Sequence, residues 1–438
     1  YICISDDKGE NIIQKTLPCS VHGNEVGRAT GDRLIYKNGR LYFGSQTAGI
    51  IYSEDMGDSW QSVDLFGEKN ISLIWTDSEG KLFIAGCSGE ANSPDGVTRG
   101  HTLYCSTDGL KSFVPLTAPD PVKYENSSYY GFVPQRITSD SRYIYITFAS
   151  SGEVFYGGMG AYACDTGSLS GGKVYRYRIE NGVPVFNKDI TPEDHIPCGY
   201  SGICSNGKML LLSTVCRKNG GDIIYTSTDS GESWKIIMNR LEYCRFDWNI
   251  PYMKPRYNGG GNCVHWISDI KLSPFDSDTA LFNTGTGLFM ITGLASGDVL
   301  VKPFCEGIEE TVHLNVYTTP HGRNRIIDII GDLGGFAFED YDSECENSFA
   351  NENGDRYITC LNADLTLSDP EYIVATPRGN WTGKTKGGLI LSKDCGSTWE
   401  RLPMPRGLSE FIDKKLDNIE KPNVDSGWTC LLYPSDAA

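Results

Sequence analysis

The sequence lacks three features that would place it in common protein classes. No run approaches the roughly 18 apolar residues that a membrane-spanning helix requires, so we expect no membrane partner. The net charge of −17 leaves no basic surface for phosphate groups, which argues against nucleic acid as a partner. Long amphipathic helical patterns are nearly absent, and only residues 408–419 have the pattern of a short helix. An acidic chain of this kind suits a neutral or cationic ligand.

The cysteines also lack the spacing of a metal site. The chain has 15 cysteines, and none falls in a CxxC pair or a Cys/His cluster typical of zinc. This number is high for a cytosolic protein, and an odd number leaves at least one thiol unpaired. The acidic clusters at 276–278 and 339–342 lack the spacing of an EF-hand loop. We therefore expect a secreted protein that needs no metal and no other cofactor.

Both ends of the chain have the character of truncations. The sequence opens at Tyr1 inside a strand-like Tyr-Ile-Cys-Ile run, without Met or a signal peptide. Residues 430–438 match nothing in the pattern that precedes them. We expect a longer parent protein and a possible non-native tail at 430–438.

What the chain does contain is a repeated turn motif, Ser-x-Asp-x-Gly-x-Ser/Thr-Trp. Full copies occupy residues 53–60, 227–234 and 392–399, and degenerate copies start at Ser5 and Ser106. Ser and Asp can hydrogen-bond the backbone of a turn, Gly supplies a positive φ, and the closing aromatic residue packs between sheets. This Asp box, together with short Val-, Ile-, Tyr- and Phe-rich strands, is typical of β-propeller blades.

The box residues are expected to be structural. Asp55, Asp229 and Asp394 belong to turns at the blade periphery, so we do not expect them to be catalytic. Their closing tryptophans should pack in blade cores: Trp60, Trp234 and Trp399.

Three further runs carry a resemblance to glycoside hydrolase family 74. The run from Gly23 to Leu34 resembles the family's GN-x-x-GR-x-x-GERL segment, and residues 266–278 resemble its W-x-x-x-x-x-x-DPF segment. The third, Gly307–Thr311 followed by Ile330–Phe336, is similar to GIEE followed by GDIGG. The runs lie in the family's order and cover roughly residues 1–410.

The resemblance implies an all-β fold of tandem seven-bladed β-propellers facing each other across a substrate cleft. This chain would hold an incomplete first propeller and the opening blades of the second. We expect an N-terminal propeller at 1–305 with its first blade missing, and the start of a C-terminal propeller at 306–429.

The resemblance also implies the chemistry, which is inverting hydrolysis of a β-1,4-glucan by two carboxylates. Asp332 matches the family's general acid. The general base belongs to an R-T-D-x-GG run that should precede Tyr1, and no copy occurs in the chain. Asp32 and Asp269 are the nearest acids for that role, but neither sits in the motif. We therefore expect the chain alone to be inactive.

The partner implied by the resemblance is xyloglucan or a related β-glucan oligosaccharide, bound by a monomer. Aromatic platforms suit sugar rings, and long segments without blade periodicity, at 151–172 and 242–261, are expected to form cleft walls. Candidate substrate-binding residues are Tyr129, Tyr130, Tyr156, Trp248, Trp266, Trp381 and Arg28.

Two alternatives remain open from the sequence. A sialidase-type exo-glycosidase needs an arginine triad, for which Arg28, Arg136 and Arg378 are available. A non-catalytic, sortilin-like or glycan-binding propeller needs no carboxylate pair at all. His265 and His313 are expected to be structural histidines in either case.

Overall fold

The computed structural model is built almost entirely from β-strands, with one short 3-10 helix, η2 (Pro251–Met253), in the part of the chain that it describes. Residues 408–419 lie outside that part. The structure describes residues 1–7, 9–21, 31–45, 47–65, 71–88, 101–116, 132–150, 171–193, 198–215, 217, 221–239, 242–253, 264, 266–308, 311–345, 348–366, 368–379 and 387–403.

The chain divides into two compact units. Unit 1 comprises Tyr1–Asp247 and Val264–Phe304, and unit 2 comprises Trp248–Cys263 and Cys305–Ala438. A short excursion of the chain, which includes η2, therefore belongs to unit 2 although it interrupts unit 1.

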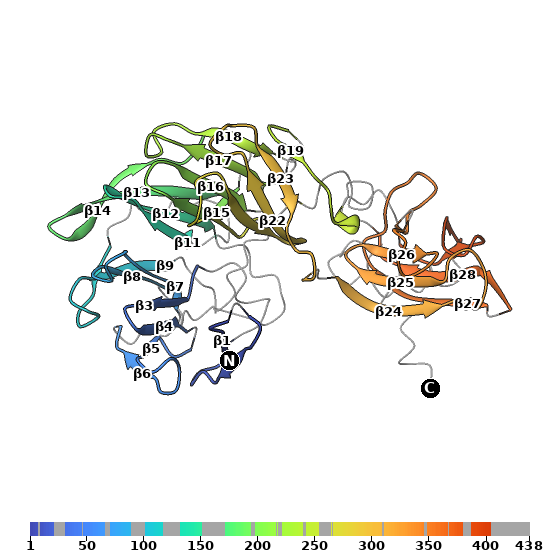
Figure 1. Ribbon diagram of the computed structural model, residues 1–438, viewed down its shortest axis with the longest axis horizontal. Helices are drawn as coiled ribbons and strands as arrows, with labels where there is room; N and C mark the ends of the chain where they lie inside the picture. Colours follow the sequence, from blue (N-terminus) through green and yellow to red (C-terminus); the bar gives the residue numbers. More distant parts are fainter. Residues whose placement is uncertain are drawn as a thin grey trace, which may run out of the picture. The chain divides into compact units, whose positions relative to one another are not determined.

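Unit 1 contains five sheets that we call blades 1 to 5, each made of strands that follow one another in sequence (Figure 1). All pairs within blades 1 to 4 are antiparallel, which is the order of an up-and-down blade. The strands are β3 (Leu34–Lys37), β4 (Arg40–Gly44), β5 (Ile50–Ser53) and β6 (Gln61–Val63) in blade 1; β7 (Ile71–Thr76), β8 (Phe83–Ser88), β9 (His101–Ser106) and β10 (Val114–Pro115) in blade 2; β11 (Phe132–Ser139), β12 (Tyr143–Ser150), β13 (Gly172–Glu180) and β14 (Val183–Asp189) in blade 3; β15 (Gly199–Ser205), β16 (Leu210–Val215), β17 (Ile223–Ser227) and β18 (Lys235–Asn239) in blade 4; and β20 (Asp269–Leu272), β21 (Ala280–Thr284), β22 (Gly287–Thr292) and β23 (Leu300–Pro303) in blade 5.

Two smaller elements complete unit 1. Strands β1 (Ile2–Ile4) and β2 (Ile13–Lys15) form an antiparallel pair, and β19 (Arg245–Phe246) adds to blade 5 in parallel with β23. The sequence offered no clear strand in the segment that contains β19, and this expectation was wrong. Two residues are too few for an alternation of apolar side chains to show.

Unit 2 begins with the three-stranded sheet β24 (Val312–Thr318), β25 (Ile326–Gly331) and β26 (Gly334–Phe338). A four-stranded sheet follows, with β27 (Cys360–Thr366), β28 (Asp369–Pro377), β29 (Ile390–Ser392) and β30 (Glu400–Arg401). The first strands of the two sheets, β24 and β27, contact each other.

The blades of unit 1 follow one another through the same kind of contact. The first strand of each blade contacts the first strand of the next, from β3 through β7, β11 and β15 to β20. Apolar clusters fill the space between neighbouring blades; one joins Ile84 of blade 2 to Ile146 of blade 3, and another joins Tyr145 to Leu212 of blade 4. Such sheets, each packed on the next through its faces, are the arrangement of a β-propeller.

The Asp boxes form the turns that their sequence predicts. In the first full copy, Ser53 Oγ accepts a hydrogen bond from the Gly57 amide at 2.7 Å, and the Asp55 carboxylate accepts the Ser59 amide at 2.8 Å and the Ser59 hydroxyl at 2.6 Å. Gly57 has a φ of +90°, which glycine adopts without strain. The copies starting at Ser227 and Ser392 repeat these bonds.

The boxes join the third and fourth strands of their blades, and their tryptophans face the interior. Trp399 is buried against Phe349, with ring centroids 4.4 Å apart. Trp60 and Trp234 are partly buried and pack on apolar clusters. The structural role predicted for these residues is confirmed, and so is the all-β fold class.

Within the described ranges no helix is long and apolar enough to cross a membrane.

Candidate functional site

Asp332 lies at the tip of the hairpin between β25 and β26, in unit 2. It adopts a left-handed backbone conformation, with φ of +62°, which Asp tolerates better than most residues. The Asp332 amide donates to Thr359 Oγ1 at 3.0 Å, and the Gly334 amide donates to the Ile358 carbonyl at 2.7 Å. These two bonds tie the tip to the segment that precedes β27.

The glycines after Asp332 are required by close packing. A Cβ at Gly334 would meet the Tyr357 carbonyl oxygen at 2.6 Å, and one at Gly335 would meet the Phe349 ring at 2.7 Å. Both distances are too short for real Cβ contacts. Glycine at positions 334 and 335 therefore lets this tip approach its neighbours.

An apolar cluster supports the hairpin from beneath. Ile330, Leu333 and Phe336 are buried together with Cys345, and Tyr252 of η2 packs against them. The excursion of the chain into unit 2 thus supplies an aromatic side chain under the residue that we expect to be catalytic.

The Asp332 side chain itself is exposed. Among the described residues, no carboxylate shares a hydrogen bond or ion pair with it. An exposed carboxyl group at this tip can reach a bound substrate, which a buried turn residue cannot. The arrangement suits one half of a two-carboxylate site.

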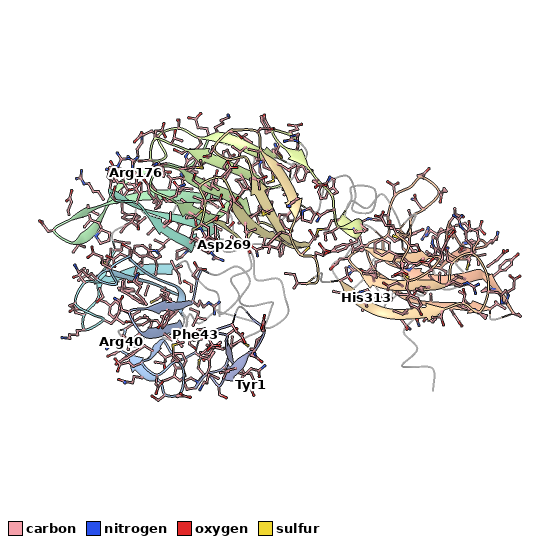
Figure 2. All side chains as sticks on the ribbon, in the orientation of Figure 1. Tyr1, Arg40, Phe43, Arg176, Asp269 and His313 are labelled. Carbon is pink, nitrogen blue, oxygen red and sulfur yellow. The ribbon has the colours of Figure 1, made fainter. Side chains whose placement is uncertain are left out.

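His313 lies on the edge strand β24 of the same sheet (Figure 2). Its Nδ1 is 2.9 Å from Oδ1 of Asp328, a buried residue of β25, and its Nε2 is 2.6 Å from Oγ1 of Thr311. Both ring nitrogens are thus hydrogen-bonded, as expected for a structural histidine.

Asp32 and Asp269, the two acids weighed as in-chain bases, meet in unit 1. Arg136 Nε lies 3.1 Å from Asp269 and 3.4 Å from Asp32, and Lys271 Nζ lies 3.2 Å and 3.3 Å from the same carboxylates. We call these four residues the inner charge cluster; Figure 2 labels Asp269. Asp32 lies just before β3 of blade 1, Arg136 on β11 of blade 3, and Asp269 and Lys271 on β20 of blade 5.

The cluster weakens both alternative roles for its members. Arg136 is 9% exposed and neutralised by two carboxylates, so it is poorly placed to clamp the carboxylate of a sialic acid. Asp32 and Asp269 are each engaged by both Arg136 and Lys271, so neither carboxylate stands free in the manner of Asp332.

Only some of the predicted substrate-binding residues lie in the described part of the chain. Trp266 is partly buried with a φ of +62° and packs against Ala149 and Val215, and Trp248 is partly buried in unit 2. Trp266 therefore has a packing role whether or not it meets a ligand. Outside the described residues lie Arg28, Tyr129, Tyr130, Tyr156, His265, Trp381 and most of the segment 151–172.

Among the described residues, no group of three or more His, Cys, Asp or Glu side chains is arranged to hold a metal ion.

Blades of antiparallel strands closed by Asp boxes define a β-propeller protein, and the exposed Asp332 tip gives it a candidate glycosidase site. No family model matches the chain. It is similar, however, to curated xyloglucanases: 23% identical over 448 residues to a Paenibacillus xyloglucanase, and 24% identical over 459 residues to the oligoxyloglucan-reducing end-specific xyloglucanase of Emericella nidulans. The alignments cover 90% and 91% of this chain, but only 40% and 54% of those proteins.

Solved structures agree in fold. The family 74 xyloglucanase from Xanthomonas campestris superposes with a TM-score of 0.71 at 21% identity, covering 92% of this chain and 57% of that one. The family 74 enzyme from Niastella koreensis gives a TM-score of 0.70 at 20% identity, with 92% and 55% covered. The resemblance to glycoside hydrolase family 74 and the propeller fold are confirmed, and the alternatives are not favoured. The chain spans about half the length of these relatives.

Sequence reasoning missed two constellations, the inner charge cluster and the bonds between Thr311, His313 and Asp328. Asp32, Arg136 and the Asp269–Lys271 pair are more than 100 residues apart from one another, so no local signal marked the cluster. The second group does have a signal in the sequence, because Asp328 interrupts the apolar run Ile326–Ile330. An acid inside such a strand has to find a partner.

Proposed function

We propose that this chain supplies the general-acid half of a glycosidase site that cleaves the β-1,4-glucan backbone of xyloglucan with inversion. Asp332 delivers a proton to the leaving glycosidic oxygen. The second carboxylate, whose carboxyl group lies about 6.5–9.5 Å from the first in an inverting site, activates the water molecule that fits between them. No R-T-D-x-GG run occurs in the printed sequence, so the base is the part of the site that this chain does not identify.

One observation carries the proposal. Asp332 occupies the exposed tip of a hairpin whose glycines are required sterically, inside the run that resembles the family's GDIGG segment. The left-handed conformation suits an Asp at this turn, and the exposed carboxyl group is free to meet a ligand. Relatives named xyloglucanase, aligned over about 90% of the chain, support the proposed substrate class.

The rest of the assignment follows from the same resemblance. The chain is the larger part of a first propeller, at 1–305, and the opening blades of a second, at 306–429. It acts on xyloglucan or a related β-glucan oligosaccharide as a secreted monomer without a cofactor. Trp248 and Trp266 remain candidate sugar contacts among the described residues.

The proposal is tested by measuring binding and hydrolysis separately on the 438-residue chain. Isothermal titration calorimetry with a xyloglucan oligosaccharide should show binding, and Asp332→Asn should keep the affinity within about twofold because it preserves shape and hydrogen bonding. Neither protein should release reducing sugar from xyloglucan.

Each alternative result has a distinct meaning. A folded chain that binds sialyllactose and no xyloglucan overturns the substrate class. Hydrolysis of xyloglucan by the chain that disappears in Asp332→Asn keeps Asp332 but overturns the half-site. Hydrolysis that Asp332→Asn leaves unchanged overturns Asp332 as the acid.

A further inference from the structure

The hydrogen bonds of His313 connect a buried carboxylate to a hydroxyl near the surface. Asp328 is only 7% exposed and sits on the central strand β25, whereas the His313 side chain is 53% exposed on β24. Thr311, the outermost of the three hydrogen-bonded residues, is partly exposed and immediately precedes β24. We call these three residues the Thr311 relay.

The strand register brings the relay to the same end of the sheet as Asp332. Val312 pairs with Gly331 in the antiparallel ladder. One residue farther along each strand come Thr311 and Asp332. Thr311 and Asp332, the residue that we expect to protonate substrate, therefore lie at neighbouring positions just beyond the same end of the sheet.

The chemistry of the partners sets the direction of each bond. A carboxylate only accepts, so Nδ1 of His313 donates to Asp328. In the neutral ring Nε2 is then an acceptor, and the hydroxyl proton of Thr311 points to it. The lone pairs of Thr311 Oγ1 remain for an outside donor.

Protonation of the ring reverses this polarity. Both nitrogens of an imidazolium donate, so Nε2 would donate to Thr311 and the hydroxyl proton would turn outward. Histidine is the side chain whose charge ordinarily changes between about pH 5 and 8. Protonation of the ring would therefore convert Thr311 from an acceptor to a donor toward an outside group.

We propose that Thr311 is a sugar-binding residue beside Asp332, and that His313 is the positioning residue that decides whether the Thr311 hydroxyl accepts from or donates to a sugar hydroxyl. This inference rests on the proposed function, because it takes a polyhydroxylated substrate at Asp332 as given. The other titratable groups on the packed strands are Asp332 at the end of β25, Tyr317 on β24, and Cys360 and Asp364 on β27.

Calorimetric titration of the chain with a xyloglucan oligosaccharide, at about pH 5 and about pH 8, tests the contact. Thr311→Val should weaken binding about three- to tenfold at both pH values, the effect of one lost hydrogen bond. Thr318→Val, at the exposed far end of β24, is the matched control and should bind like the wild type. The wild-type affinity should differ between the two pH values, and His313→Gln, which cannot titrate, should remove that part of the difference.

Nitrogen NMR of ¹⁵N-histidine-labelled chain tests the relay without any ligand. At about pH 8, Nδ1 of His313 should carry the proton, and Asp328→Asn should abolish this preference. A proton on Nε2 in the wild type overturns the relay.

The outcomes separate this inference from the proposed function. Unchanged binding by Thr311→Val overturns the sugar contact and leaves Asp332 untouched. An unaltered pH profile in His313→Gln overturns the positioning role. If the folded wild type binds no xyloglucan oligosaccharide, the proposed function fails and the sugar contact with it, while the NMR result still decides the relay.

Discussion

At the scale of single residues, this chain separates aspartates by what surrounds them. Asp55 in an Asp box is saturated with donors, Asp328 is buried against an imidazole, and Asp332 stands exposed on a tip. The hydrogen bonds of the first confirm the structural turn role that the sequence motif predicts for it. The setting of the other two depends on which strands lie beside them.

The donors in a box have a measurable consequence. The hydroxyl and amide of Ser59, with Ser53, lower the pKa of Asp55 from 3.8 to about 2. A depressed pKa stabilises the fold above the unfolded value, and this contribution is lost as pH falls from about 4 to about 2. We expect Asp55→Asn to lower the melting temperature above pH 4, with the deficit shrinking as the pH falls below 4.

Thermal unfolding followed by circular dichroism between about pH 3 and 7 checks this prediction. Asp6→Asn, which changes an exposed aspartate whose carboxylate makes no hydrogen bond among the described residues, is the control and should show no such trend. A deficit that is the same at every pH would contradict the assignment to the carboxylate.

At the scale of elements, polar bonds hold neighbouring blades in register. Asp222, at the start of β17 in blade 4, is fully buried and accepts from Thr214 Oγ1 at 2.9 Å, the Arg217 amide at 3.0 Å and the Ile267 amide at 3.1 Å. The last of these bonds fixes the segment that leads into β20 of blade 5. One carboxylate thus joins two blades that no sequence motif connects.

Removing the charge of Asp222 should weaken the connection between blades 4 and 5. Asp222→Asn puts an amide NH₂ against buried donors, and each group left unsatisfied costs about 1–3 kcal/mol. We expect lower stability and faster hydrogen exchange in residues 264–272, measured by mass spectrometry. Thr214→Val leaves the bond between Asp222 and the Ile267 amide intact, so it should have the smaller effect on exchange in residues 264–272. An equal effect of both variants there would contradict the role of Asp222 in connecting the two blades.

At the scale of the whole molecule, unit 1 is held by the first strands of its blades and by the inner charge cluster. Breaking a buried ion pair by removing one partner typically costs about 3–5 kcal/mol. Asp32 and Lys271 are partly exposed, so solvent screens their share and the loss here is smaller. The cluster ties blades 1, 3 and 5 together by charge.

Arg136→Met should therefore destabilise unit 1 by about 1–3 kcal/mol, because it removes the buried cation that Asp269 and Asp32 share and leaves them the exposed Lys271. Urea unfolding monitored by hydrogen exchange measures the loss in β11 and β20, with β28 of unit 2 as the internal reference. Lys271→Met, at the solvent-exposed position, should cost less. If Lys271→Met costs as much as Arg136→Met, burial does not govern the strength of the cluster.

The sequence alone determined the blades and the likeness to family 74. Box turns and strand alternation are local, because a turn's bonds form within five residues and a strand's faces alternate every two. Asp332 was reached the same way, since the glycines that its tip needs are its neighbours in sequence. Its predicted catalytic role still rests on the resemblance.

Only the tertiary structure decided which polar groups meet. Arg136 reaches Asp32 and Asp269 across more than 100 residues, and His313 finds Asp328 only because β24 pairs with β25 in one register. Such contacts depend on how sheets stack, which the period of a single strand does not encode. The fold was therefore readable from short-range patterns, whereas the electrostatic partners of its acids were not.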